Sequence, residues 1–210
     1  MKANLLPIAK YSWKYIAYTL LAFFVFEILD FDLLEFLAFL LLLTFLYIYR
    51  NPEREILYFG ANSVLSPVDG TVVLIENIDD DYYTYKVEIE STLFSNGFLR
   101  SPMQSSVNSI AVHRGAKLAK IAPLANKINE NVVIEFEDKN ANRLKVLHRA
   151  KENFDDLHVD IKNGEYLYQS KRYGFMTNLT TTLYLPDNFR LDIAKNQELK
   201  ASESLVGYFS

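Results

Sequence analysis

The sequence predicts a mainly β protein, in which an N-terminal α-helical hairpin precedes a β-sandwich or barrel-like domain. Two long apolar runs lie within the first fifty residues, and short alternating runs broken by turn residues follow from Val64 onward. A chain of 210 residues is long enough for one globular domain and one extra element. We therefore place the helical hairpin in residues 1–54 and the β-rich domain in residues 55–210.

The hairpin is formed by the apolar runs Tyr15–Leu29 and Leu33–Tyr49, which are joined by Asp30–Asp32. At about 1.5 Å per residue, each run can roughly cross a hydrocarbon core of about 30 Å, the first only if its ends reach the headgroups. We expect a transmembrane hairpin or a re-entrant one, because the first run is short and contains Glu27. A buried hairpin in a soluble core would be unusually rich in Leu and Phe. A cleaved signal peptide would have one apolar region and a small-residue cleavage site.

Charged residues are divided between the two ends of this hairpin. The acidic residues gather at the tip, whereas the basic residues lie before the first run and after the second: Glu27, Asp30, Asp32 and Glu35 at the tip, and Lys2, Lys10, Lys14, Arg50 and Arg54 at the other end. The positive-inside rule then predicts the cytoplasmic (inner) membrane, with the β-rich domain facing the cytoplasm.

Strands are predicted where Val, Ile, Thr and aromatic residues alternate with polar ones between Gly, Pro, Asn and Asp turns. The predicted strands are Thr71–Ile78, Tyr85–Thr92, Asn131–Asp138, Arg143–Ala150, Thr180–Pro186 and Ser204–Ser210.

Composition excludes several classes of site. The chain has no cysteine, which removes disulfides and thiolate metal sites, and its net charge of −4 gives no nucleic-acid footprint. The three histidines, His113, His148 and His158, are not spaced for metal binding, and we interpret each as a solvated or core-edge side chain. Phosphate-loop and nucleophile-elbow motifs are absent.

A threonine-rich stretch, "YGFMTNLTTTLYLP", lies near the C-terminus. Its composition is typical of a strand that Pro186 ends. Asn178-Leu179-Thr180 is also a glycosylation sequon, which would matter only in a secreted protein and is set aside because of the predicted cytoplasmic location. The third interpretation, a reactive site, depends on the rest of the chain.

Two motifs give the chain a resemblance to a known family. "YRNPER" directly follows the apolar hairpin, and "VLSPVDGTVV" comes next. Together with "FLRSPMQSSVNSIAV" and the closing "YLPDNFRLDIAKNQELKASESLVGYF", they resemble the short form of the phosphatidylserine decarboxylase family, in order and over nearly the whole chain.

The resemblance implies a pyruvoyl enzyme made by self-cleavage at a Gly-Ser pair, which decarboxylates phosphatidylserine to phosphatidylethanolamine. Asp69 matches the family's motif aspartate. The family's histidine falls on Ser106 and the aspartate before it on Gln104. The Gly-Ser pair falls on Asn178 and Leu179, or with one gap on Leu179 and Thr180, and this chain has no Gly-Ser dipeptide.

Three hypotheses follow. We favour a membrane-anchored homologue that lacks self-processing, needs no cofactor, and binds an anionic membrane phospholipid or assists a partner membrane enzyme. The alternative is an active decarboxylase in which Thr180 or Thr181 is the nucleophile, His113 the base, and a 2-ketobutyryl group replaces pyruvoyl. The third is a membrane-tethered β scaffold with coincidental motifs. A homo-oligomer is compatible with each.

Overall fold

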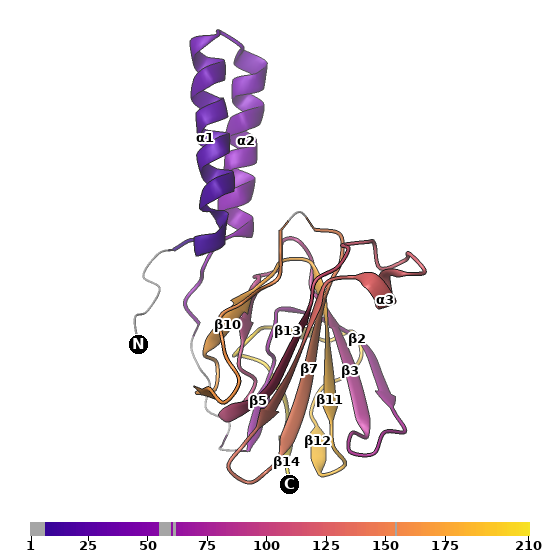
Figure 1. Ribbon diagram of the computed structural model, residues 1–210. Helices are drawn as coiled ribbons and strands as arrows, with labels where there is room; N and C mark the ends of the chain where they lie inside the picture. The colour runs from indigo at the N-terminus through magenta and orange to yellow at the C-terminus, as the bar shows by residue number, and fades with distance from the viewer. Residues whose placement is uncertain (1–6, 55–59, 61, 154) are drawn as a thin grey trace. The chain divides into compact units, whose positions relative to one another are not determined.

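The computed structural model describes residues 7–54, 60, 62–153 and 155–210. The chain forms two compact units, Met1–Glu53 and Arg54–Ser210 (Figure 1). The first is helical and the second consists mainly of β-strands.

The helical unit is a hairpin of α1 (Trp13–Ile28) and α2 (Asp32–Ile48), preceded by the short 3-10 helix η1 (Lys10–Ser12). Asp30 has a φ of +55°, a left-handed conformation that stops α1 and turns the chain back. The outer ends are tied together, since Ile8 pairs with Arg50 and the Ala9 N–H donates to the Tyr49 carbonyl at 2.9 Å. The sequence therefore produces the predicted hairpin, with its charged tip at the turn.

The transmembrane form of the hairpin prediction is not supported. In the part of the chain that the structure describes, no helix combines the length and apolarity needed to cross a membrane. The helices α1 and α2 have 16 and 17 residues, whereas a spanning helix needs about 20.

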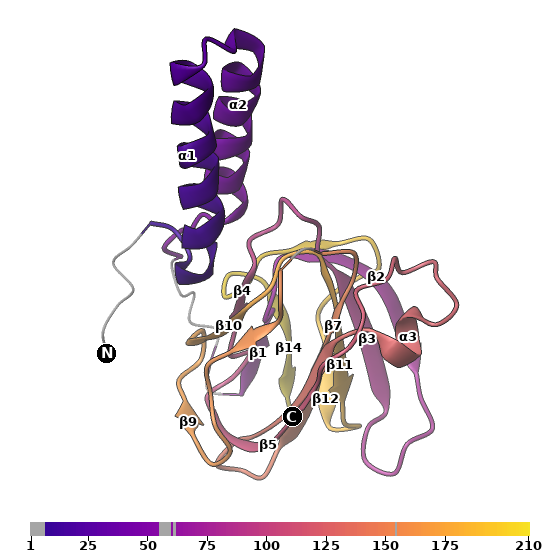
Figure 2. The same ribbon diagram turned by 45° about the horizontal axis from the view of Figure 1, so that its top comes forward.

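The β unit contains three antiparallel sheets. Eight strands form the large sheet in the order β13-β2-β3-β11-β7-β6-β5-β9, and two small sheets have the orders β1-β14-β12 and β4-β10-β8 (Figure 2). The bounds are β1 (Ser63–Leu65), β2 (Gly70–Asn77), β3 (Tyr85–Glu90), β4 (Phe98–Arg100), β5 (Ser105–His113), β6 (Asn131–Glu137), β7 (Arg143–Ala150), β8 (His158–Val159), β9 (Tyr166–Leu167), β10 (Arg172–Phe175), β11 (Leu179–Leu185), β12 (Phe189–Leu191), β13 (Glu198–Leu199) and β14 (Leu205–Phe209). The short helix α3 (Ala125–Ile128) lies between β5 and β6.

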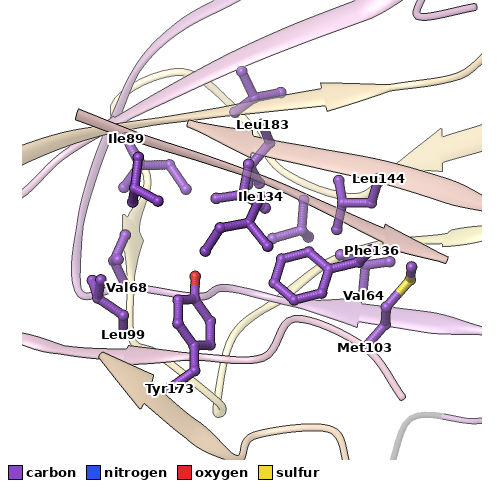
Figure 3. Close-up of a cluster of buried hydrophobic side chains, with 14 of the residues drawn as sticks. Val64, Val68, Ile89, Leu99, Met103, Ile134, Phe136, Leu144, Tyr173 and Leu183 are labelled. Carbon is purple, nitrogen blue, oxygen red and sulfur yellow. The ribbon is translucent and has the colours of Figure 1, made fainter. Parts of the chain in front are cut away.

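One hydrophobic core joins all three sheets. Alternate residues of β6, β7 and β11 are buried in it, together with side chains from the small sheets such as Val64, Leu99 and Val206. Figure 3 shows Tyr173 reaching into this cluster from β10, with Phe136 and Ile134 beside its ring. The mainly β class predicted from the sequence is confirmed.

The threonine-rich stretch forms β11, which lies inside the large sheet. It pairs with β3 from Thr180 to Leu185 and with β7 from Leu179 to Tyr184. Leu179, Thr181, Leu183 and Leu185 therefore share one face, and Thr180 and Thr182 share the other. All six of these side chains are buried.

Gly70, in the predicted Asp-Gly turn, allows β2 to approach β3. A Cβ at this position would collide with the main-chain carbonyl of Glu90. We expect Gly70→Ala to lower the free energy of unfolding by about 1–3 kcal/mol, because backbone must move. Urea unfolding of the full chain in detergent micelles measures the change. Thr71→Ala, at the next position of β2, is the control, and equal losses for the two variants would contradict the collision.

Candidate functional site

The site begins at the turn that leads into β11. Asn178 has a φ of +49°, a left-handed conformation in which glycine is the least strained residue. Its side-chain amide donates to the Glu152 carbonyl at 2.6 Å, which compensates for the missing glycine. This is one of the two positions where the resemblance puts the family's glycine.

The main-chain carbonyl of Asn178 accepts a hydrogen bond from the Lys151 N–H at 3.1 Å. In a Gly-Ser pair placed here, the serine hydroxyl would attack this carbonyl. The next residue is Leu179, which is buried in the hydrophobic core and carries no hydroxyl group. A pyruvoyl group is made from a serine of the chain itself, so the residue at this position does not fit that group.

Asp69 lies close to this turn through Ser91. The Ser91 N–H donates to the Leu179 carbonyl at 2.9 Å, and the Ser91 hydroxyl donates to the Asp69 carbonyl. The main-chain carbonyl groups of Asp69 and Leu179 therefore accept hydrogen bonds from the same residue, Ser91.

The Asp69 carboxylate has two partners of its own. One oxygen accepts from the Arg54 guanidinium at 2.6 Å, and the other accepts from the Ala201 N–H at 2.8 Å. Both side chains of the ion pair are largely buried. Through this ion pair and hydrogen bond, Asp69 connects the "NPER" motif to the C-terminal segment.

Thr181 is hydrogen-bonded to His148, and the prediction of a solvated or core-edge side chain is wrong for this histidine. His148 is fully buried, its Nδ1 lies 2.7 Å from the Thr181 hydroxyl, and its Nε2 lies 2.6 Å from the Tyr173 hydroxyl. Burial lowers the pKa of His148 from 6.5 to about 3, so the ring is neutral at physiological pH. Burial also raises the pKa of the Tyr173 phenol. We call Tyr173, His148 and Thr181 the core polar chain.

Thr180 faces the other side of the sheet, where it lines a cavity of about 70 Å³. Arg149 and Lys151 of the sheet and Lys120 of the β5–β6 loop also line this cavity, with Glu88 as the one carboxylate. The cavity is further lined by Ala125, Asn126, Asn129 and Ala150. Burial lowers the pKa of the Lys151 ammonium group. Lys120 and Lys151 both pair with Glu90, so the group suited to a small anion is Arg149, which has no carboxylate within 4.0 Å among the described residues.

His113 is not brought to the threonines. It pairs with Asn131, which pairs with Arg149, which pairs with Thr180. Three strand spacings of about 4.8 Å separate His113 from Thr180, roughly 14 Å in all. A direct proton transfer between the two side chains is therefore excluded in this conformation.

The two positions that replace the family's Asp and His also lie away from β11. Ser106 pairs with Glu137 near the opposite end of β5, and Gln104 donates to the Tyr166 hydroxyl at 2.5 Å. Six residue steps along the sheet, roughly 20 Å, separate the Ser106 row from the Thr180 row. The described residues contain no group of three His, Asp or Glu side chains suited to a metal ion.

Comparison with known proteins decides the family. Residues 41–207 match the sequence profile of phosphatidylserine decarboxylase. The chain belongs to the phosphatidylserine decarboxylase family. The resemblance inferred from the motifs is thereby confirmed, and the hypothesis that those motifs are coincidental is wrong.

Curated relatives match over almost their whole length. The chain is 25% identical over 203 residues to the phosphatidylserine decarboxylase proenzyme of Paraburkholderia xenovorans, covering 95% of each protein. It is 26% identical over 204 residues to that of Paraburkholderia phytofirmans, again covering 95% of each. The proenzyme of Burkholderia pseudomallei is 25% identical over 203 residues, which cover 95% of this chain and 94% of the relative.

The core polar chain generates a pH prediction. His148 takes up a proton at a pH near 6.5 when unfolded but only near 3 when folded. Unfolding is therefore favoured progressively as the pH falls below about 6.5, by up to about 1.4 kcal/mol per pH unit from this group. Urea unfolding between pH 7 and pH 4.5 measures the slope.

The matched control is a chain in which His148→Leu, Thr181→Val and Tyr173→Phe replace the three polar groups together. It retains every exposed carboxylate, so only the contribution of the buried histidine is removed. We expect a smaller loss of stability with falling pH in this variant. An unchanged slope would show that His148 is not held neutral in the folded protein.

Proposed function

We propose that this chain is a phospholipid-binding member of the phosphatidylserine decarboxylase family that does not cleave itself and acts at a membrane surface. Membership of the family supports a role in phospholipid metabolism. The observation that carries the absence of self-processing is Leu179, an apolar core residue at the start of β11, where the ungapped match puts the family's serine; the match with one gap puts it on Thr180.

The rest of the site supports the same conclusion. The next hydroxyl groups after Leu179 belong to Thr180 and Thr181, inside a strand that is paired on both sides. His113, the proposed base, and Ser106 and Gln104, the residues at the family's His and Asp positions, all lie away from Leu179.

One observation favours the alternative, an active decarboxylase with a threonine-derived group. The Thr181 hydroxyl lies 2.7 Å from a neutral imidazole, which is the geometry of a nucleophile and its base. His148 would then replace His113 in the role of base. The same contact has a structural reason, however, because a buried hydroxyl and a buried imidazole each require a partner.

The first test is the covalent state of the purified protein. We expect a single chain of 24.3 kDa by intact mass and no CO₂ release from carboxyl-labelled phosphatidylserine. Thr181→Val should change neither result. Two fragments that meet between Asn178 and Thr182 would contradict the proposal, and their loss in Thr181→Val would establish the alternative.

A designed variant separates the missing nucleophile from the missing base. Asn178→Gly with Leu179→Ser restores the pair at the left-handed turn. We expect this variant to stay uncleaved near neutral pH, because loss of a general base typically costs about 10²–10⁴ in rate. Rapid self-cleavage of this variant would mean that the site still contains a working base.

Membrane association is supported by the surface of the hairpin. Large apolar side chains are exposed around both helices, among them Leu21, Ile28, Leu33 and Phe36. Contiguous apolar surface of this kind is typical of a membrane or protein contact. We propose that the hairpin enters one leaflet of the inner membrane, with the basic end and the β unit on the cytoplasmic side. A topology reporter fused after Ser210 tests the orientation.

Mid-hairpin charges test the membrane contact itself. Leu21→Asp with Leu40→Asp should weaken binding to phospholipid vesicles by at least about tenfold, because each buried carboxylate costs about 2.5–3.5 kcal/mol. Both leucines are exposed in the hairpin, so its packing is preserved. Tyr168→Asp, an exposed site in the β unit, is the control. Equal binding by both variants in co-sedimentation would overturn this part of the proposal.

A further inference from the structure

The loop between β5 and β6, residues 114–130, presents apolar side chains to solvent without a structural reason. Ile121 is 93% exposed, and Leu124 and Ile128 are exposed by 54% and 44%. None of the three belongs to the hydrophobic core. Figures 1 and 2 show the segment with α3 projecting beyond the edge of the large sheet.

The base of this loop is held by several hydrogen bonds. The Asn129 amide group donates to the Leu118 and Ala150 carbonyls at 2.8 and 2.9 Å, and its oxygen accepts from the Leu118 N–H at 3.0 Å. The Glu130 N–H donates to the Ala116 carbonyl at 2.8 Å. The exposed tip is itself a turn, since the Ala122 N–H donates to the Ala119 carbonyl at 2.9 Å. Ile121 therefore lies exposed within a hydrogen-bonded turn.

The charge of the loop indicates what it contacts. Residues 114–130 contain four basic side chains and one acidic side chain, Glu130, although the whole chain has a net charge of −4. Arg114 pairs with Glu130 of the loop itself, and Lys117 and Lys120 pair with Asp156 and Glu90 of the domain body. Lys127 has no carboxylate within 4.0 Å among the described residues.

The anion-suited cavity lies directly behind this loop, which supplies one of its walls. Arg149 contacts the Asn126 amide oxygen at 3.2 Å, and its Nε is buried without a hydrogen-bond partner. A buried guanidinium N–H without a partner is costly, and a phosphate or carboxylate group would satisfy it. The loop therefore carries the apolar tip and also supplies one wall of the cavity that Arg149 lines.

We propose that the β5–β6 loop is a second membrane contact, in which Ile121 and Leu124 enter the interface of a bilayer that contains anionic phospholipid. Lys127 of α3 and Arg149 of β7 are the cations that would meet the headgroups. An apolar tip surrounded by basic residues favours an anionic bilayer over a protein surface, because it matches both the hydrocarbon and the negative layer above it. The inference rests on the proposed function only in requiring a phospholipid membrane.

The chain contains no cysteine, so single cysteines can report each contact separately. An environment-sensitive fluorophore is attached to full-length Ile121→Cys, to Asn163→Cys in an exposed turn, and to Leu21→Cys in the hairpin. The vesicles contain phosphatidylcholine alone or phosphatidylcholine with phosphatidylserine. We expect a blue shift at position 121 that is larger with phosphatidylserine, and none at position 163.

The outcomes distinguish this inference from the proposed function. A shift at position 21 without one at position 121 overturns the loop contact and leaves the hairpin contact standing. A shift at position 121 alone supports the loop and overturns the hairpin. No shift at either position overturns both. A concentration-dependent shift at position 121 without lipid would show that a second copy covers the loop, and would also overturn the inference.

Unlabelled variants give an independent measurement. Ile121→Ser with Leu124→Ser should weaken binding to phosphatidylserine vesicles by about tenfold, with Tyr168→Ser as the control. Lys127→Gln should reduce the preference for phosphatidylserine by about fivefold, whereas Lys195→Gln, at another exposed site, should not. Unchanged binding in both loop variants would contradict a membrane contact here.

Discussion

The pairing of β11 with β3 on one side and β7 on the other is the constraint on which the rest of the β unit depends. This pairing fixes which side chains of β11 point to the core and which point to the opposite side of the sheet. Leu179, Thr181 and Leu183 point into the hydrophobic cluster, and Thr180 points to the cavity on the other face. The same pairing places the Asn178 turn beside Ser91, and through Ser91 beside Asp69. The pairing of β3 with β11 therefore positions both Asp69 and the start of β11.

This constraint explains how the fold persists without the reactive pair. A serine at position 179 would place a hydroxyl at the margin of the core, whereas leucine contributes about 1.5–3 kcal/mol of apolar burial. Asn178 retains the left-handed backbone, and its amide bonds the Glu152 carbonyl. The Asp69 carboxylate still joins Arg54 to the segment at Ala201. The architecture is therefore built without a Gly-Ser pair.

Much of the fold could be predicted because local patterns were strong. The hairpin was visible in two apolar runs, and β2, β3, β6, β7, β11 and β14 alternate clearly. The predicted runs Tyr15–Leu29 and Leu33–Tyr49 match the bounds of α1 and α2 to within about two residues. The strand β5 was not predicted from alternation, because "SSVNSIAVH" is rich in Ser and Asn. Its strand conformation comes from pairing with β6 and β9. Local propensity gives no information about such pairing.

The candidate site was harder to predict because its contacts join distant segments. Asp69 was found from a motif, but its proximity to Leu179 depends on Ser91, which has no sequence signal. His148 did carry one: it alternates in phase with Leu144 and Val146, and Thr181 does so with Leu179 and Leu183. That phase predicts burial for both side chains. Their contact requires the register between β7 and β11, and the contact with Tyr173 requires a third strand from another sheet.

The positions of the heavy atoms do not determine in which direction the hydrogen bonds of the core polar chain run. If Tyr173 donates to His148, then the imidazole donates to Thr181, and the threonine hydrogen has no acceptor among the described residues; reversed donation leaves the tyrosine hydrogen without one. The two tautomers have the same number of hydrogen bonds, and exchange between them requires one proton to leave at the threonine and another to arrive at the tyrosine. Burial of all three side chains keeps water away from both ends, so whichever tautomer forms during folding is retained until the core opens.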